Sequence, residues 1–243
     1  MTRRDSKQVE FGRTLRALAF LLRYPDAAWR TDLEEVGAAL REAGTLDAAR
    51  LLQIDALLET IRTAEELDAE AAYVELFDRG RGAALHMFEH VHGDSRERGP
   101  AMLDLIATYE QAGLALRSDE LPDHLTVLLE YASTQPREAA VALLGEVAHI
   151  LRRIYGALDK RGSSYAAVLG ALLDLAGADA EAGADASEPE PDLDEAWQEP
   201  AAFDGCGNAG QQGAGQSQTV RVVRRAPAAG APAGSSANQG AQP

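Results

Sequence analysis

The chain has 243 residues, 46% of them hydrophobic, and its 39 acidic side chains against 23 basic ones give a formal net charge of −16. This balance excludes a nucleic-acid-binding protein, because such proteins need Lys and Arg to neutralise phosphates. The single cysteine, Cys206, excludes an internal disulfide, and the longest strongly apolar stretch, Leu15 to Leu22, is too short to cross a membrane. We therefore expect a cytoplasmic protein.

Residues 1–177 show helical periodicity and no strand alternation of useful length. Apolar residues recur three and four positions apart in eight stripes: Phe11–Leu22, Trp29–Leu40, Leu51–Ile61, Leu67–Val74, Met102–Leu116, Leu121–Ala132, Val147–Leu158 and Tyr165–Leu175. Pro25, Pro122 and Pro136 stand near predicted helix starts, where a missing N–H costs little. The pattern predicts an all-α protein, a single globular bundle of about eight helices.

An N-terminal export signal is an alternative for the first predicted helix, because Arg3 and Arg4 precede an apolar region as in twin-arginine signals. Glu10, Arg13 and Arg16 interrupt that region, and no small-residue cleavage site follows it. We favour a folded helix.

The composition changes near Gly177. Residues 178–243 are rich in Gly and Pro, and Trp197 and Phe203 are their only aromatic residues. Such a segment cannot bury enough apolar surface to offset the entropy lost on ordering. We predict a helical domain over residues 1–177 and a disordered tail over residues 178–243, acidic at first and then rich in Gly, Ala and Gln. Trp197, flanked by acids, leaves open that part of the tail docks on the bundle or on a partner.

The least generic stretch, residues 73–105, holds much of the protein's aromatic and imidazole chemistry: Tyr73, Phe77, His86, Phe88, His90 and His92. Within it, HMFEH has the H-x-x-E-H spacing of a zinc hydrolase. On a helix His86 and His90 could share a zinc ion, with Glu89 as the base for a bound water. The pattern has only three fixed positions, so hydrogen-bonded or solvent-facing histidines are the simpler interpretation.

Arg79, Gly80, Arg81 and Gly82 could cradle a phosphate. The run lacks the Lys-Ser/Thr ending of a phosphate-binding loop and follows a predicted helix, so a hinge loop is favoured. The sequence also has no G-x-S-x-G motif, and Cys206 lies in the predicted tail. We expect no catalytic activity, and we assign the chain no metal or cofactor of its own.

A second unusual stretch, ELPDHLTVLLEYAS, runs from Glu120 to Ser133. We expect Pro122 to open a helix, with Asp123 in its first turn, where the helix dipole favours an anion, and with His124 beside it. An ordinary well-capped helix is the simplest interpretation.

Together these stretches resemble the NarJ family, the delta-subunit assembly chaperones of respiratory nitrate reductase, within the wider TorD-like group. The strings that carry the resemblance are YVELFDRGR (residues 73–81), LHMFEHVHGDSRERGPAM (85–102), YEQAGL (from 109), ELPDHLTVLLEY (120–131), LRYPD (22–26) and DLDEAWQEP (192–200). The resemblance spans about residues 10–200.

The resemblance implies an all-helical, non-catalytic protein that acts in the cytoplasm. Its partner would be the N-terminal peptide of the catalytic alpha subunit of respiratory nitrate reductase, held until the molybdenum cofactor is inserted. The chaperone would not remain in the finished enzyme. In TorD-like relatives the Pro-Asp-His segment belongs to the client groove, which implies the same for Pro122, Asp123 and His124. On resemblance and composition we add six groove candidates: Tyr73, Phe77, Arg81, Phe88, Glu89 and His90.

A physical mechanism is compatible with this resemblance. A client leader that folds into an amphipathic helix would set its apolar side chains into a groove between helices. Basic residues on the leader would be attracted by the acidic chain, which predicts salt-dependent association. The histidines predict pH-dependent binding. Two alternatives remain: a zinc hydrolase using His86, Glu89 and His90, and an adaptor whose acidic tail does the binding.

Overall fold

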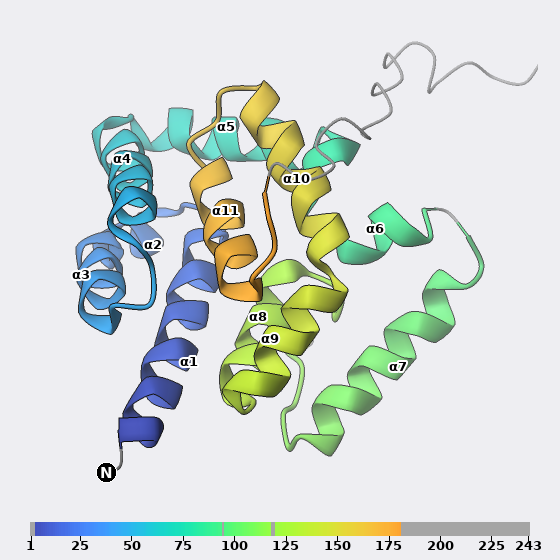
Figure 1. Cartoon of the computed structure of the whole chain (residues 1–243). Coiled ribbons are helices and arrows are strands. Elements are labelled where there is room, and N and C mark those ends of the chain that lie inside the picture. The colour runs from blue at the N-terminus through green and yellow to red at the C-terminus, as the bar shows by residue number, and fades with distance from the viewer. Residues whose placement is uncertain (1–2, 94, 118–119, 181–243) are drawn as a thin grey trace, which may run out of the picture. The chain divides into compact units, whose positions relative to one another are not determined.

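A computed structural model describes residues 3–93, 95–117 and 120–180 of the chain, all within a unit that spans Met1–Pro191. These residues form eleven α-helices and one 3₁₀ helix (Figure 1). In chain order they are α1 (Arg3–Leu21), α2 (Ala27–Thr31), α3 (Leu33–Ala43), α4 (Ala48–Thr63), α5 (Glu66–Phe77), η1 (Arg81–Ala83), α6 (Met87–Val91), α7 (Arg98–Gln111), α8 (Leu125–Thr134), α9 (Arg137–Glu146), α10 (Ala148–Lys160) and α11 (Ala166–Ala176).

The prediction of an all-α fold is confirmed, and the eight predicted stripes correspond to nine of the helices. The Trp29–Leu40 stripe is divided between α2 and α3, because the chain turns at Asp32, whose N–H bonds back to the Trp29 carbonyl. The two remaining helices had no stripe of their own. Helix α6 has only five residues, and α9 buries only Ala140 and Leu144. Such short or lightly buried helices leave a weak periodic signal.

The core is built around α1 and α11. Helix α1 packs on α8, α3 and α11, and α11 packs on α10, α9 and α4. Residues 166–173 of α11 are all buried, so this helix is apolar on every side, as expected of a central helix. Helices α1 and α8 cross closely at Gly12, where a Cβ atom would lie 2.6 Å from the carbonyl oxygen of Ser133.

The predicted stripe over α5 was placed on the wrong face. Leu67, its first member, is 77% exposed, whereas Tyr73 and Phe77 are buried. The Tyr73 hydroxyl donates to the Leu22 carbonyl at 2.7 Å, and its ring packs on those of Phe77 and Tyr165. Aromatic rings bury more area than Leu or Ala and set which face of a helix turns inward.

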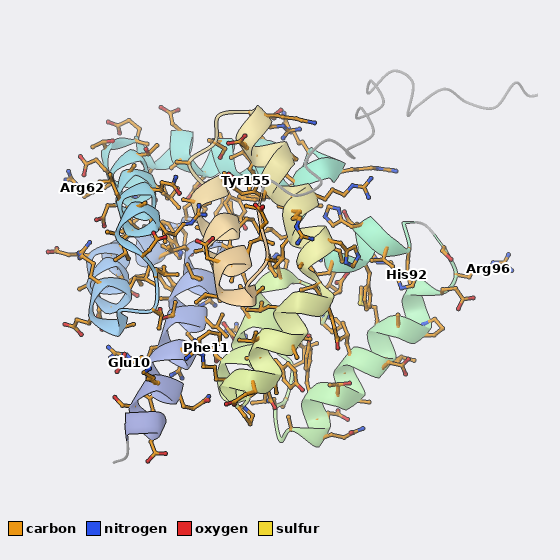
Figure 2. The ribbon with its side chains drawn as sticks, viewed as in Figure 1. Glu10, Phe11, Arg62, His92, Arg96 and Tyr155 are labelled. Carbon is orange, nitrogen blue, oxygen red and sulfur yellow. The ribbon has the colours of Figure 1, made fainter. Side chains whose placement is uncertain are left out.

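Helix α7 ends at Gln111, earlier than its stripe predicted, and Leu116 lies beyond it. Only Tyr109 of this helix is buried, and Leu103 is 67% exposed. Figure 1 shows α7 along the outer side of α8, joined to α6 by a connector, and Figure 2 labels His92 and Arg96 in that connector. Helix α7 is therefore held mainly by contacts at its two ends.

No helix in the described part of the chain combines the length and apolar character of a membrane span. Helix α11 ends at Ala176, and Gly177 follows in the left-handed conformation that favours glycine at a helix C-terminus. The division of the chain into a helical domain over residues 1–177 and a tail stays a prediction. From residue 181 onward the predicted tail, with Trp197 and Cys206, lies outside the described residues.

Candidate functional site

The two unusual stretches of the sequence meet in space through an isolated antiparallel bridge between His86 and His124. The Met87 N–H donates to the Asp123 carbonyl at 2.9 Å, and the Leu125 N–H donates to the Leu85 carbonyl at 2.8 Å. The strand-like segment before α6 is thereby joined to the turn before α8. We call this region the junction and define its polar members as His86, Glu89, Arg98, Asp123 and His124.

The expectation that Pro122 opens a helix is wrong. Helix α8 begins at Leu125, and His124 is its N-cap, with Nδ1 accepting a hydrogen bond from the Thr126 N–H at 3.4 Å. Asp123 therefore precedes the helix instead of lying in its first turn. The physical reason is the bridge, which takes the Asp123 carbonyl and the Leu125 N–H and keeps this backbone extended.

The Asp123 carboxylate is the centre of the junction and is only 1% exposed. One oxygen lies 3.3 Å from Nδ1 of His86. The other accepts the Phe88 N–H at 3.2 Å and lies 3.4 Å from Nη2 of Arg98, which also approaches Glu89 at 3.6 Å. One buried carboxylate thus ties together the segment before α6, the start of α7 and the turn before α8.

These contacts shift the pKa values of Asp123 and His86 in opposite directions. Burial by itself raises the pKa of the Asp123 carboxyl. The hydrogen bond and charge of His86, the Phe88 N–H and the Arg98 guanidinium more than offset that effect and hold the pKa below its usual value. The hydrogen bond to Asp123 also raises the pKa of His86, against the opposing effect of burial. The geometry therefore favours an ionised Asp123 and a protonated His86.

Burial favours the neutral form of His124 and of His90. Burial and, to a smaller extent, the charge of His86, whose ring centroid is 4.9 Å away, lower the pKa of His124 to about 4 against the opposing effect of Asp123. Burial also lowers the pKa of His90, whose Nε2 donates to the Ala84 carbonyl at 2.8 Å. The carboxylate of Asp123 is thus paired with His86, which is distant in the sequence, and not with the adjacent His124.

The structure contradicts the geometry that the zinc hypothesis requires, namely His86 and His90 on one face of a helix. Helix α6 begins at Met87, so His86 precedes the helix, and His86 and His90 do not share one helical face. The ring of His86 contacts Asp123, whereas that of His90 contacts the Ala84 carbonyl. Among the residues that the structure describes, no group of three or more His, Cys, Asp or Glu side chains is arranged to hold a metal ion.

The Arg79–Gly82 run does not form an anion cradle. Arg79 pairs with Glu75 on α5 at 3.0 Å, and Arg81 is exposed at the start of η1. Gly80 packs against the guanidinium of Arg161, so close that a Cβ atom would lie 2.8 Å from one of its nitrogens. The two arginines of the run therefore have different surroundings and do not converge on one site.

The nominated groove residues fall into two classes. Tyr73, Phe77, Pro122 and Asp123 are buried, and the first two belong to the hydrophobic core. The others have some exposure: Arg81 is exposed, and the rest are half-buried, namely Phe88, Glu89, His90 and His124. In this conformation the first class supports the structure, and only the second offers atoms to another molecule.

A pocket of about 400 Å³ lies beside the junction, and the sequence analysis did not identify it. Helices α1 and α8 and the segment after α7 form its walls. Its apolar and aromatic lining comprises Phe20, Tyr109, Leu114, Leu116, Val127 and Tyr131. Cavities of this size and character hold a few apolar side chains or a small ligand.

Tyr109 connects the pocket to the junction. Its hydroxyl donates to the Pro122 carbonyl at 2.8 Å, and its ring packs on Tyr131 with centroids 5.0 Å apart. Both tyrosines lie in the strings that carry the family resemblance, but 22 positions apart, and nothing in their spacing predicts contact. The pocket depends on tertiary packing that periodicity alone does not specify.

The chain is similar to known proteins of nitrate reductase assembly. The model of a family described as "Nitrate reductase delta subunit" matches residues 26–171. The chain is 46% identical over 156 residues to the nitrate reductase molybdenum cofactor assembly chaperone NarJ of Escherichia coli (strain K12). That match covers 64% of this chain and 66% of the relative, just under two thirds of its length.

Two further similarities were found. The probable nitrate reductase molybdenum cofactor assembly chaperone NarJ of Bacillus subtilis (strain 168) is 34% identical over 163 residues, which cover 66% of this chain and 86% of the relative. A crystal structure of a putative redox enzyme maturation protein from Archaeoglobus fulgidus is 18% identical, with a TM-score of 0.49, over 67% of this chain and 91% of the other.

Proposed function

Because the chain belongs to the nitrate reductase delta subunit family, we propose that it is an assembly chaperone for a respiratory nitrate reductase. It binds the N-terminal segment of the catalytic alpha subunit in the cytoplasm and holds that subunit for molybdenum cofactor insertion. It catalyses no reaction and leaves before the enzyme is complete. The similarity to two proteins named as assembly chaperones supports this proposal.

The pocket between α1 and α8 is the observation that carries the proposal. Its apolar lining suits side chains that a client must keep from water until it folds. The described residues form helices and one isolated bridge, so they offer no sheet edge to which an extended peptide could add. A helix laid in a groove, with apolar anchors in the pocket, is the mode that such a surface allows.

The junction positions the wall of this pocket. Asp123 binds the start of α7 through Arg98, and the Pro122 carbonyl binds the end of α7 through Tyr109. The segment after α7 supplies Leu114 and Leu116 to the pocket. We assign Pro122, Asp123 and His124 a positioning role. Phe88, Glu89, His90 and Arg81 remain proposed contacts for a longer client.

A peptide-binding experiment tests the proposal. A fluorescent peptide with the N-terminal residues of the host's nitrate reductase alpha subunit is titrated with the full chain, and anisotropy reports the Kd. Val127→Glu places a charge among the apolar lining of the pocket and should weaken binding by at least about tenfold, since a buried unpaired charge is costly.

The matched control is Leu103→Glu, which introduces the same charge at an exposed apolar residue of α7 that does not line the pocket. It should bind like the unmodified protein. Circular dichroism and thermal unfolding verify that both variants are folded. A folded Val127→Glu variant with unchanged affinity would remove the pocket from the proposal.

Electrostatic attraction gives a second readout. The net charge of −16 should speed the encounter with a cationic leader, an effect that salt screens. Stopped-flow association rates should therefore fall as ionic strength rises, while the dissociation rate changes little. An association rate that does not depend on salt would contradict this part of the mechanism.

A further inference from the structure

Four charged side chains line the pocket: Arg16, Arg23, Glu120 and Glu130. Within the described part of the chain, none of these side chains makes an ion pair or a hydrogen bond. The neighbouring Arg13 on α1, by contrast, pairs with both Glu10 and Glu42. The four charged side chains at the pocket rim are therefore available to another molecule.

The alignment of α1 against α8 places the two arginines on one side of the pocket and the two glutamates on the other. The two helices run antiparallel, because Gln8 donates to the Gln135 carbonyl and Gly12 packs against Ser133. One turn further along α1, Arg16 comes level with Glu130. Arg23 lies seven residues later, just beyond the end of α1 at Leu21, and Glu120 lies in the segment before α8, at the other end of the pocket from Glu130.

The pocket thus has a cationic wall on α1 and the turn that follows it, and an anionic wall on α8 and the segment before it. Both signs are present at both ends of the pocket. A client helix whose apolar ridge points into the pocket presents one flank to each wall. Turning that helix end for end exchanges its flanks, so a helix with one acidic and one basic flank meets opposite charges in only one direction.

We propose that the two charged walls fix the direction in which a client helix lies in the pocket. This inference rests on the proposed function, since it concerns the same pocket and the same client. The preferred client has its basic flank on the side of Glu120 and Glu130 and its acidic flank on the side of Arg16 and Arg23. Direction matters to an assembly chaperone, because it decides on which side of the complex the rest of the client emerges.

The test uses two designed amphipathic peptides of about fifteen residues, long enough to form a helix when bound. Both have the same apolar ridge and composition, with Lys on one flank and Glu on the other, and the second peptide exchanges the flanks. Each carries a benzoylphenylalanine at its N-terminus. After illumination with the full chain, mass spectrometry locates the crosslink near Glu130 or near Glu120.

The two peptides should crosslink at opposite ends of the pocket, with at least about a fivefold excess over the other end. In the fourfold variant Arg16→Glu, Arg23→Glu, Glu120→Lys and Glu130→Lys, which keeps the net charge, both peptides should exchange ends. A variant with Gln at all four positions should bind both without a preferred end. Circular dichroism verifies that each variant is folded.

The outcomes separate this inference from the function on which it rests. If the N-termini of both peptides crosslinked at the same end of the pocket, or at both ends equally, the direction inference would be overturned. The proposed function would still stand. Failure of the wild-type chain to bind either designed peptide or the natural N-terminal peptide would overturn the proposed function itself.

Discussion

Charged side chains contact one another at the junction but not at the pocket rim, by which we mean Arg16, Arg23, Glu120 and Glu130. Tyr109 nevertheless connects the two regions. At the junction the Asp123 carboxylate is buried and contacts His86, Arg98 and the Phe88 N–H. At the rim, charged side chains that line an open pocket have no partner among the described residues. Charges that satisfy one another hold the fold in place, whereas charges left unpaired beside an apolar pocket are available to another molecule. Changes at the junction should thus alter stability, and changes at the rim should alter binding.

The largest effect should follow from Asp123→Ala. Removing one partner of a buried charged network leaves the others desolvated without compensation, which costs about 3 to 5 kcal/mol. His86, Arg98 and the Phe88 N–H would all lose their acceptor. Urea unfolding at pH 7 should show a free energy of unfolding lower by about this amount.

Asp123→Asn is the matched control, because it keeps the shape and one acceptor oxygen but not the charge. It should lose less stability than Asp123→Ala. If Asp123→Ala were as stable as the unmodified protein yet failed to bind the client peptide, the carboxylate would be a client contact, and the contrast between the two regions would collapse.

The second prediction concerns acid. His124 has a pKa of about 4 in the folded chain and an ordinary value near 6.5 when unfolded. A depressed pKa means that the neutral form stabilises the fold above pH 6.5 and that this stability is lost as the pH falls. The loss from His124 should be about 2 kcal/mol at pH 5.

The two neighbouring histidines modify this loss in opposite directions. His90, whose pKa is also lowered, adds to the loss. His86, whose pKa is raised by Asp123, stabilises the fold at low pH and gives up that contribution as the pH rises through its folded pKa. His124→Asn keeps an N-cap side chain but cannot titrate, so its unfolding free energy should fall less between pH 7.5 and pH 5. An unchanged slope would show that His124 is not the titrating group.

The sequence predicts the helices better than it predicts the site. Stripes such as Phe11–Leu22 and Tyr165–Leu175 correspond to α1 and α11, because long helices with one or more buried faces repeat a strong signal. The start of α8 was misplaced because the Asp123 carbonyl accepts the N–H of Met87, 36 positions earlier in the chain. A local sequence pattern does not detect such a distant pairing. The unusual composition of the sequence nevertheless singled out both stretches that meet at the junction.

The same reasoning explains why the pocket was missed. Its lining comes from three separate segments, and residues such as Phe20 and Val127 look like ordinary core positions in their own helices. Tyr73 and Phe77 stood out by their aromatic character, yet that character serves the core. Aromatic and histidine content thus marked an important part of the chain without distinguishing buried supports from surface contacts.

A smaller effect is expected at the link between the two regions. Tyr109→Phe removes the hydroxyl that donates to the buried Pro122 carbonyl. The net loss of such a hydrogen bond is about 1 kcal/mol. Because the same ring lines the pocket, client affinity should also weaken by a few fold.

Tyr131→Phe serves as the comparison for Tyr109→Phe, since its ring also lines the pocket but its hydroxyl has no hydrogen bond within the described residues. It should leave stability unchanged. Equal losses in the two variants would indicate a general effect of removing a tyrosine hydroxyl from the pocket and not a link to the junction.

The smallest effect on stability should come from the rim itself. Arg16→Gln with Arg23→Gln removes two charges that have no partner among the described residues, so the free energy of unfolding should change by less than about 0.5 kcal/mol. The acidic chain becomes more negative, so a cationic client peptide should associate faster at low salt. A peptide with one basic and one acidic flank should show a weaker preference for one direction, because only the anionic wall remains. A clear loss of stability would mean that these arginines are already satisfied within the protein, as the junction charges are, and that no charge at the pocket is reserved for a partner.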